Sequence, residues 1–271
     1  MFPSAIRDDL QMEISTGTLI ALLFAALLAG WVDAVVGGGG LIQLPALLIG
    51  LPDDVPVATV AGTNKVSSVA GTFVASLTYL RKVAVTVTAA LPLMFFAFVG
   101  SSGGARLAHF IPKEFFTFIV LAVLVVVGTY TIRRPSLGLN HEIRYTGIRH
   151  AVTLSIVGLV IGIYDGILGP GTGTFFVIAI VAFLGYGFLE ASALSKLANL
   201  TTNVAAIVVF GFSGSIIWKL GLLMACANFA GGLIGARTAV KYGSGFVRKV
   251  FLVVLVGLAI RLIWDIVRSV L

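Results

Sequence analysis

The sequence predicts an all-α integral membrane protein built from two homologous repeats, and three observations lead to this prediction. The first is composition: 59% of the 271 residues are hydrophobic and only 11% are charged, whereas soluble domains carry about 25% charged residues. The second is a series of long apolar segments. The third is an internal similarity, because glycine, aspartate and lysine residues of the first half recur at a fixed distance in the second.

The apolar segments divide evenly between the two halves. They fall at 18–36, 41–51, 57–80, 84–107 and 115–132, and then at 151–168, 172–186, 190–212, 216–240 and 246–266. A helix needs about 20 apolar residues to cross a bilayer. Segments 41–51 and 172–186 are shorter than this, and each follows a glycine-rich break. The first segment is too long for the core of a cleavable signal, so we expect it to be a retained helix.

The internal similarity indicates a duplication. A shift of 132 residues places Gly30, Asp33, Gly37 and Gly39 on Gly162, Asp165, Gly169 and Gly171. A shift of 131 places Lys65 on Lys196, and "GAR" at 104–106 on "GAR" at 235–237. We therefore expect residues 1–134 to form the first transmembrane repeat, 135–149 a cytoplasmic linker loop and 150–271 the second transmembrane repeat.

The distribution of basic residues favours an inverted arrangement of the two repeats. With about five membrane segments in each repeat, most basic loop residues fall on one side, which the positive-inside rule makes cytoplasmic: Arg81, Lys82, Arg133, Arg134, Arg144, Arg149, Arg237, Lys241, Arg248 and Lys249. If the short segments dip into the membrane without crossing, the repeats are parallel and the charge difference is smaller. Both arrangements stay open, and the first is preferred.

The polar composition argues against several classes of function. The net charge is +7, but basic residues that lie between apolar segments are typical of cytoplasmic helix ends, so we expect no nucleic-acid partner. The single cysteine, Cys226, has no evident partner, and the histidines lie in or near loops. We therefore expect no metal site, no cofactor and no catalytic cluster.

Two lysines lie well inside apolar segments, where a charged side chain costs at least about 2.5–3.5 kcal/mol. Three and seven residues after each lysine, on the same helical face, come side chains that can form hydrogen bonds; another precedes each lysine. The candidate binding residues are Asn64, Lys65, Ser68 and Thr72 in the first half, and Ser195, Lys196, Asn199 and Asn203 in the second. The lysines either form structural ion pairs with Asp33 and Asp165 or line a cavity that attracts an anion, and both roles are compatible.

The glycine-rich stretches "GWVDAVVGGGG" at 30–40 and "GIYDGILGPGTG" at 162–173 predict broken helices. Glycine allows a helix to stop and a half-helix to begin with free N–H groups, which favour an anion. The candidate groups are Gly38, Gly39, Gly40, Gly171 and Thr172. Close helix packing is the alternative explanation of the glycines. Asp33 and Asp165 come one turn before the breaks, and they are candidates for proton coupling or for counter-ions.

These motifs resemble the sulfite exporter TauE/SafE family, also called the toluene sulfonate uptake permease family. The similarity rests on "GWVDAVVGGGGLIQLPAL", "AGTNKVSSVAGTF" and "YLRKV", and on "GIYDGILGPGTGTFF", "ALSKLANLTTN" and "FGFSGSIIW" in the second half. It implies a multi-pass permease of the bacterial inner membrane, acting on sulfite, sulfoacetate, other organosulfonates or related small anions. It also implies substrate contacts at the Asn-Lys and Ser-Lys pairs. Pro170 and Thr172 depart from the glycine pattern of the first half.

The function expected from these features is secondary transport of a small anion by alternating access around the two lysines. The expected partners are this anion and the lipid bilayer, and a homo-oligomer stays open. A passive anion channel is the main alternative. A membrane-embedded enzyme and an auxiliary subunit without transport are less favoured.

Overall fold

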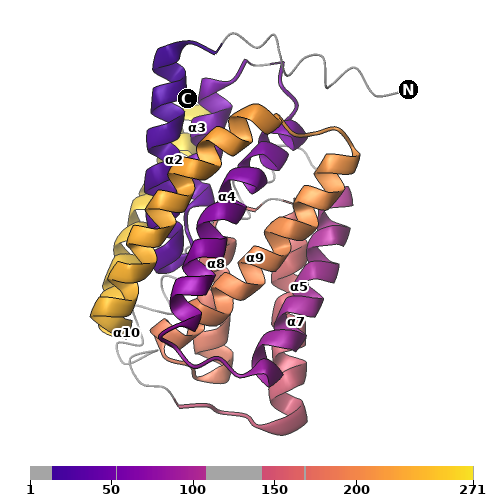
Figure 1. Cartoon of the computed structure of the whole chain (residues 1–271), viewed down its shortest axis with the longest axis vertical. Coiled ribbons are helices and arrows are strands. Elements are labelled where there is room, and N and C mark those ends of the chain that lie inside the picture. The colour runs from indigo at the N-terminus through magenta and orange to yellow at the C-terminus, as the bar shows by residue number, and fades with distance from the viewer. Residues whose placement is uncertain (1–13, 53, 108–141, 168, 271) are drawn as a thin grey trace.

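The computed structural model describes residues 14–52, 54–107, 142–167 and 169–270, and all regular elements in this part are helices (Figure 1). Before the undescribed residues 108–141 come α2 (Thr16–Val36), α3 (Gly40–Gly50), α4 (Val57–Leu80) and α5 (Val87–Leu107). After them come α7 (Gly147–Ile167), α8 (Thr172–Ala179), the π-helix η2 (Ile180–Leu184), α9 (Phe188–Phe212) and α10 (Trp218–Val270). The predicted all-α class is confirmed.

The helices follow the predicted segments closely, with three differences. Segment 84–107 becomes helical only at Val87, and segment 172–186 is divided between α8 and η2. Segments 216–240 and 246–266 lie on either side of Gly243, whose φ of 71° interrupts the helical geometry of α10. The predicted segment 115–132 lies outside the described residues.

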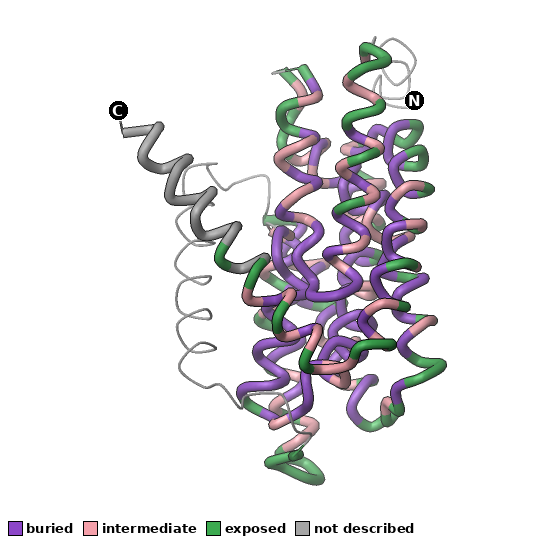
Figure 2. Tube along the Cα trace, turned by 90° about the vertical axis from the view of Figure 1, so that its left-hand side faces the viewer, coloured by how far each residue is buried: buried purple, intermediate pink, exposed green. Residues whose placement is uncertain are grey.

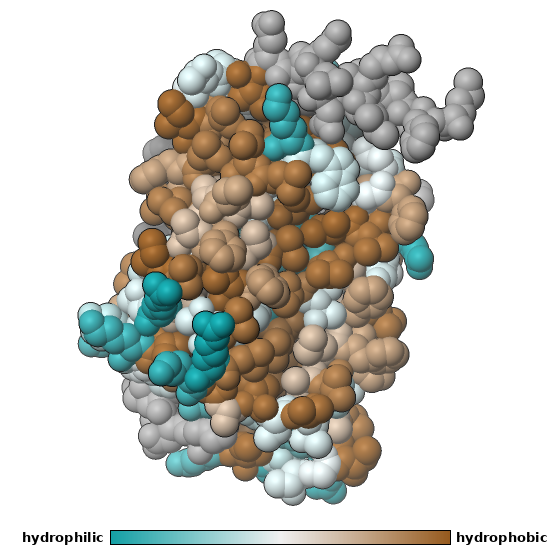
Figure 3. Space-filling view, in the orientation of Figure 1, coloured by the Kyte–Doolittle hydropathy of each residue, from teal (hydrophilic) through white to brown (hydrophobic). Residues whose placement is uncertain are grey.

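The bundle has the surface of a membrane protein. Five described helices are long and apolar enough to cross a bilayer: α2, α5, α7, α9 and the Trp218–Val253 part of α10. Buried residues gather between the helices, and exposed ones face outward (Figure 2). The outward side chains include large apolar ones such as Ile20, Phe24, Leu91 and Phe95, and the surface is largely hydrophobic (Figure 3). Such a surface is stable only against lipid.

Each short element returns the chain toward the end at which the preceding long helix begins. A side chain added at Gly50, the last residue of α3, would contact Thr18 and Leu22 near the start of α2. At the end of η2, the N–H of Arg144 donates to the carbonyl oxygen of Leu184 at 2.9 Å, close to the start of α7. Both short elements therefore run antiparallel to the helix before them.

One end of the bundle gathers the loops that were predicted to share a side. A hollow of about 240 Å³ brings Val85 of the α4–α5 loop beside Tyr145 and Tyr186. A second hollow brings the loop residues Arg81 and Lys82 beside α10. This placement agrees with the preferred topology, while the repeat itself and its inversion stay predictions.

Glycines allow the long helices to pack closely in two places. At the α2–α10 contact, a Cβ added to Gly30 would lie 2.2 Å from the carbonyl oxygen of Asn228. At the α5–α7 contact, a Cβ added to Gly162 would lie 2.5 Å from the carbonyl oxygen of Ala97. In lipid the hydrophobic effect does not drive helices together, and the van der Waals contacts between such closely packed backbones stabilise their association instead.

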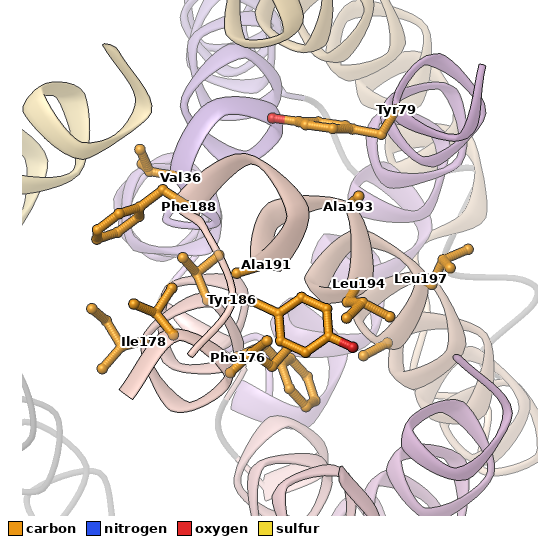
Figure 4. Close-up of a cluster of buried hydrophobic side chains, with 14 of the residues drawn as sticks. Val36, Tyr79, Phe176, Ile178, Tyr186, Phe188, Ala191, Ala193, Leu194 and Leu197 are labelled. Atoms are coloured by element: carbon orange, nitrogen blue, oxygen red, sulfur yellow. The ribbon is translucent and has the colours of Figure 1, made fainter. Parts of the chain in front are cut away.

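The apolar core surrounds the broken segments. Side chains of α8, η2 and α9, among them Phe176, Phe188 and Leu197, form one buried apolar cluster with Val36 at the end of α2 (Figure 4). Tyr79 of α4 is fully buried there and donates a hydrogen bond to the carbonyl oxygen of Ala34 at 3.0 Å. This packing holds the two glycine breaks in the interior of the bundle.

Candidate functional site

The first predicted lysine forms a buried ion pair with an acid of the other half. Lys65 lies on α4 and Asp165 on the last turn of α7, and Lys65 Nζ lies 2.5 Å from Asp165 Oδ2. The two side chains are 5% and 1% exposed. The second carboxylate oxygen of Asp165 is buried without a hydrogen-bond partner among the described residues. This carboxylate is therefore only partly satisfied, although an isolated buried charge is very costly.

The second lysine forms the corresponding pair in the opposite sense. Lys196 Nζ, on α9, lies 3.1 Å from Asp33 Oδ2 on the last turn of α2, and it also donates to the backbone carbonyl oxygen of Asp33. The Lys196 side chain is fully buried, and that of Asp33 is 13% exposed. The ion pairs expected as one of the two alternatives are thus present. They are crossed, because each lysine of one half binds the aspartate of the other.

Each lysine also lies at the glycine break of the opposite half. A Cβ added to Gly169 would be 3.2 Å from Lys65 Nζ. The carbonyl oxygen of Asp33 accepts from Lys196 and also from the N–H of Gly37, at 2.8 Å. Two ammonium groups are therefore held beside the two points where helices end inside the bundle.

The two breaks pack directly on each other. Gly37, Gly169 and Gly171 have positive φ angles of 87°, 83° and 79°, which glycine adopts without the steric cost of a side chain. A Cβ added to Gly37 would lie 2.1 Å from the carbonyl carbon of Gly173. Broken helices and close packing were alternative explanations of these glycines, and the structure shows both at once.

At the predicted half-helix starts, some of the hydrogen-bonding groups are already bonded to other groups of the protein. Gly39 is the N-cap of α3, and Gly38, Gly39 and Gly40 lie at or next to this helix start. Gly171 is the N-cap of α8 and Thr172 its first residue. The Thr172 hydroxyl donates to the carbonyl oxygen of Gly169 at 2.8 Å, and the Thr174 N–H to that of Gly37 at 3.1 Å.

The two polar stripes meet between α4 and α9. Asn203 Nδ2 donates to Thr72 Oγ1 at 3.1 Å, and both residues are buried. The Thr72 hydroxyl donates onward to the carbonyl oxygen of Ser68. The structure thus brings together stripe residues that lie 131 positions apart in the sequence.

The remaining candidates differ in how much of their hydrogen-bonding capacity is used. The Ser195 hydroxyl donates to the carbonyl oxygen of Gly173 at 2.8 Å, which ties α9 to α8. Asn64 is 4% exposed, and its Oδ1 lacks a partner among the described residues. Asn199 is 6% exposed. Asn64 is therefore a polar group beside Lys65 with unused capacity, whereas Ser195 has a structural partner.

A second buried polar network was not predicted from the sequence. Asn228 of α10 donates to the carbonyl oxygen of Ala26 at 3.0 Å and to Gln43 Oε1 at 2.9 Å. Gln43 is fully buried, and its Nε2 lacks a partner in the described part of the chain. The available signal was a glutamine in the short segment 41–51 and an asparagine inside an apolar run, since polar residues in membrane segments mark function.

The arrangement encloses the charged groups inside a polar interior. Lys65 is 4% exposed and Lys196 is fully buried. The ammonium groups thus lie among hydroxyl and amide groups, all buried or nearly so. Among the described residues, no group of histidine, cysteine and acidic side chains could hold a metal ion.

The comparisons with known proteins agree with this description. The family described as "Sulfite exporter TauE/SafE" matches residues 22–262. The chain is 39% identical over 250 residues to "Probable membrane transporter protein ORF9" of Sinorhizobium sp, covering 91% of this chain and 93% of that protein. It is 32% identical over 254 residues to a "Probable membrane transporter protein" of Haemophilus influenzae, covering 94% and 98%.

A third relative is "Probable membrane transporter protein YfcA" of Escherichia coli, at 30% identity over 253 residues, covering 93% of this chain and 92% of that protein. No solved structure matches the chain. The family match and the nearly full-length relatives show that this multi-pass protein of the bacterial inner membrane belongs to the TauE/SafE sulfite exporter family of membrane transporters.

Proposed function

We propose that the protein is a secondary transporter for a small anion. The proposed substrate is sulfite, an organosulfonate such as sulfoacetate, or a related sulfur-containing or carboxylate anion. The observation that carries this proposal is the crossed pair of ion pairs, Lys65–Asp165 and Lys196–Asp33, each beside the glycine break of the opposite half. Buried polar networks that serve stability alone do not need two lysines at mid-membrane, because apolar packing achieves the same at lower cost.

In this mechanism the aspartates hold the lysines until substrate arrives. A sulfonate, bisulfite or carboxylate group carries the single negative charge of an aspartate carboxylate, and the sulfite dianion carries two, so each can replace Asp165 or Asp33 as partner of the ammonium group. Asn64, Ser68 and Thr72 then supply hydrogen bonds from α4, and Ser195, Asn199 and Asn203 from α9. The N–H groups at Gly38, Gly39, Gly40, Gly171 and Thr172 contribute further positive potential.

Burial of both lysines supports alternating access rather than an open pore. Lys65 is only 4% exposed and Lys196 is fully buried, so in the proposed mechanism binding requires one set of helices to move relative to the other. The crossed ion pairs join the two halves, and exchanging them for a substrate weakens that connection. Transporters with broken helices at the midplane use such motion around a fixed site.

An aspartate that substrate displaces must be protonated or remain a costly buried charge. Anion binding therefore favours proton uptake, and we propose that transport is coupled to protons. Uptake of substrate into vesicles should respond to an imposed pH gradient. Uptake that is indifferent to the gradient and to a protonophore would remove this part of the mechanism.

The decisive experiment is thermal stabilisation of the purified protein by sulfite, thiosulfate, sulfate, sulfoacetate, taurine, acetate and chloride. An anion at 100 times its dissociation constant should stabilise the protein by about 2.7 kcal/mol. We expect stabilisation by a sulfonate or sulfite in the wild type and in Lys219→Ala, which removes an exposed lysine. We expect none in Lys65→Ala or Lys196→Ala.

Two outcomes would contradict the proposal. Stabilisation that persists in both buried-lysine variants would show that the lysines do not bind the anion and have a structural role instead. Labelled substrate that fails to show counterflow in proteoliposomes, while still equilibrating across the membrane, would identify a passive channel.

A further inference from the structure

A basic hollow lies at one end of the bundle, away from the buried lysines. It has a volume of about 370 Å³ and lies between the C-terminal end of α4 and α10. Four cationic side chains line it: Arg81, Lys82, Arg237 and Lys241. Arg81 follows Lys65 by sixteen residues along and just beyond α4, which at 1.5 Å per residue is about 24 Å. The hollow is therefore separate from the proposed substrate site.

Within the part of the chain that the structure describes, no carboxylate forms an ion pair with the cations of this hollow. All four side chains are exposed, and none of the four takes part in the ion pairs of the described residues that involve Lys65 and Lys196. Lys241 Nζ lies 5.2 Å from the centroid of the Tyr242 ring, a contact that leaves its positive charge in place. Four like charges around one concavity repel each other, and an anion between them would relieve that repulsion.

The walls of the same hollow are partly apolar. Leu233 and Val240 line it, and Leu80 and Ile234, on the same two helices, are 45% and 55% exposed. In Figure 3, hydrophilic atoms stand over the lower part of α10, with hydrophobic surface directly above them. A cationic rim next to an apolar, lipid-facing wall matches a ligand with a charged head and a hydrocarbon tail.

We propose that this hollow binds the phosphate headgroup of an anionic phospholipid, whose acyl chains lie along the apolar surface of α4 and α10. Arginine guanidinium groups suit phosphate oxygens because they can donate two parallel hydrogen bonds. Basic hollows between membrane helices on the cytoplasmic side commonly recognise such headgroups. A lipid bound here joins α4, which carries Lys65, to α10 close to its break at Gly243.

A lipid fits these observations better than a soluble phosphate does. A soluble anion would contact the cationic rim alone, whereas a lipid would also cover the apolar wall with its hydrocarbon tail.

The test is a titration of the purified full-length protein with phosphatidylglycerol and with phosphatidylcholine, followed by native mass spectrometry. The variant is Arg81→Gln/Arg237→Gln. Its matched control is Arg149→Gln/Lys249→Gln, which removes the same charge from exposed positions outside the hollow. At about fivefold in affinity per cation, the first variant should bind phosphatidylglycerol roughly 25-fold more weakly, and the control should bind like the wild type.

Three results would overturn the proposal: equal loss in both variants, equal binding of the two lipids by the wild type, or displacement of the lipid by glycerol 3-phosphate. The last result would identify a site for soluble phosphate. If Arg81→Gln/Arg237→Gln does not yield monodisperse protein, Lys82→Gln/Lys241→Gln removes the other two cations and leaves both arginines in place. Unchanged phosphatidylglycerol binding in that variant would equally overturn the proposal.

Discussion

The ammonium group of Lys65 and the carboxylate of Asp165 stabilise each other only while both are present. Each is almost completely buried, so removing one leaves the other as an unpaired charge in the interior of the bundle. The same holds for Lys196, although Asp33 is slightly more exposed and could recruit water. In the proposed mechanism, the pairs stabilise the bundle in the absence of substrate and provide two cationic groups when substrate replaces the carboxylates.

Substitutions at the Lys65–Asp165 pair can separate these structural and transport roles. Lys65→Met should lower the free energy of unfolding by about 3–5 kcal/mol, because Asp165 loses its partner. Lys65→Met/Asp165→Asn should recover most of this loss, since neither residue is charged, yet it should remain inactive in vesicle transport. Thermal unfolding and uptake of labelled substrate provide the two measurements, and Lys219→Met is the control.

Recovery of both stability and transport in the double variant would show that the charge of Lys65 is not needed for the substrate. A double variant no more stable than Lys65→Met would show that the two residues do not act as a pair. The free energies of the single and double variants together give the coupling between the residues.

At this scale the sequence identifies the charged residues and their possible pairing, but not which lysine pairs with which aspartate. Ionisable groups stand out in apolar segments, so Asp33, Lys65, Asp165 and Lys196 could be found without a structure. Their crossed pairing depends on contacts between residues 100 and 163 positions apart, which no local pattern encodes. The Gln43–Asn228 contact was missed for the same reason, and neither residue takes part in the repeated motifs.

The spacing of small residues along the helices determines where two helices can pack closely. Gly100 and Gly104 of α5 lie against α7, where Gly158, Gly162 and Gly166 approach from the other side. Added Cβ atoms at these positions would meet backbone atoms of the opposite helix at 2.5 Å or less. The van der Waals contacts that such close approach allows are a main source of attraction between helices in lipid.

Gly104→Ala and Gly103→Ala form a matched pair for testing the α5–α7 contact. A Cβ at Gly104 would lie 2.2 Å from the carbonyl oxygen of Ile163, whereas one at Gly103 meets nothing within 4 Å. Both substitutions gain up to about 1 kcal/mol of helix propensity. Gly104→Ala should still destabilise the protein by about 1–3 kcal/mol through overpacking, and Gly103→Ala should not. Equal midpoints of thermal unfolding for the two variants would show that the α5–α7 contact can widen without a loss of stability.

Element positions were predictable where the bilayer dictates length, and less so where tertiary packing decides. The long segments and the short ones at 41–51 and 172–186 were recognised because helix length reflects membrane thickness. The π-helical turn at Ile180–Leu184 was not predicted, since no residue type in "IVAFL" marks it. The contact between Gly37 and Gly173 could not be derived either, because it joins two breaks whose relative position the sequence does not specify.

The whole molecule has one end that is rich in basic side chains, and this asymmetry determines its expected orientation. Arg81, Lys82, Arg237 and Lys241 meet at this end. Lys219 lies near the start of α10, twenty-two residues before Lys241 and thus about 33 Å away along the helix. The positive-inside rule predicts that the end with the four clustered cations is cytoplasmic.

Cysteine labelling tests both the arrangement and the orientation. In a Cys226→Ala background, Lys82→Cys and Lys241→Cys should react with a membrane-impermeant maleimide in inside-out vesicles but not in spheroplasts. Lys219→Cys should show the reverse, because it lies at the other end of the same helix as Lys241. Reaction of Lys82→Cys and Lys241→Cys from opposite sides would contradict the shared end, and with it the five-plus-five topology. Reaction of both from outside would keep that topology but invert the molecule, so that the proposed lipid site would face the outer leaflet.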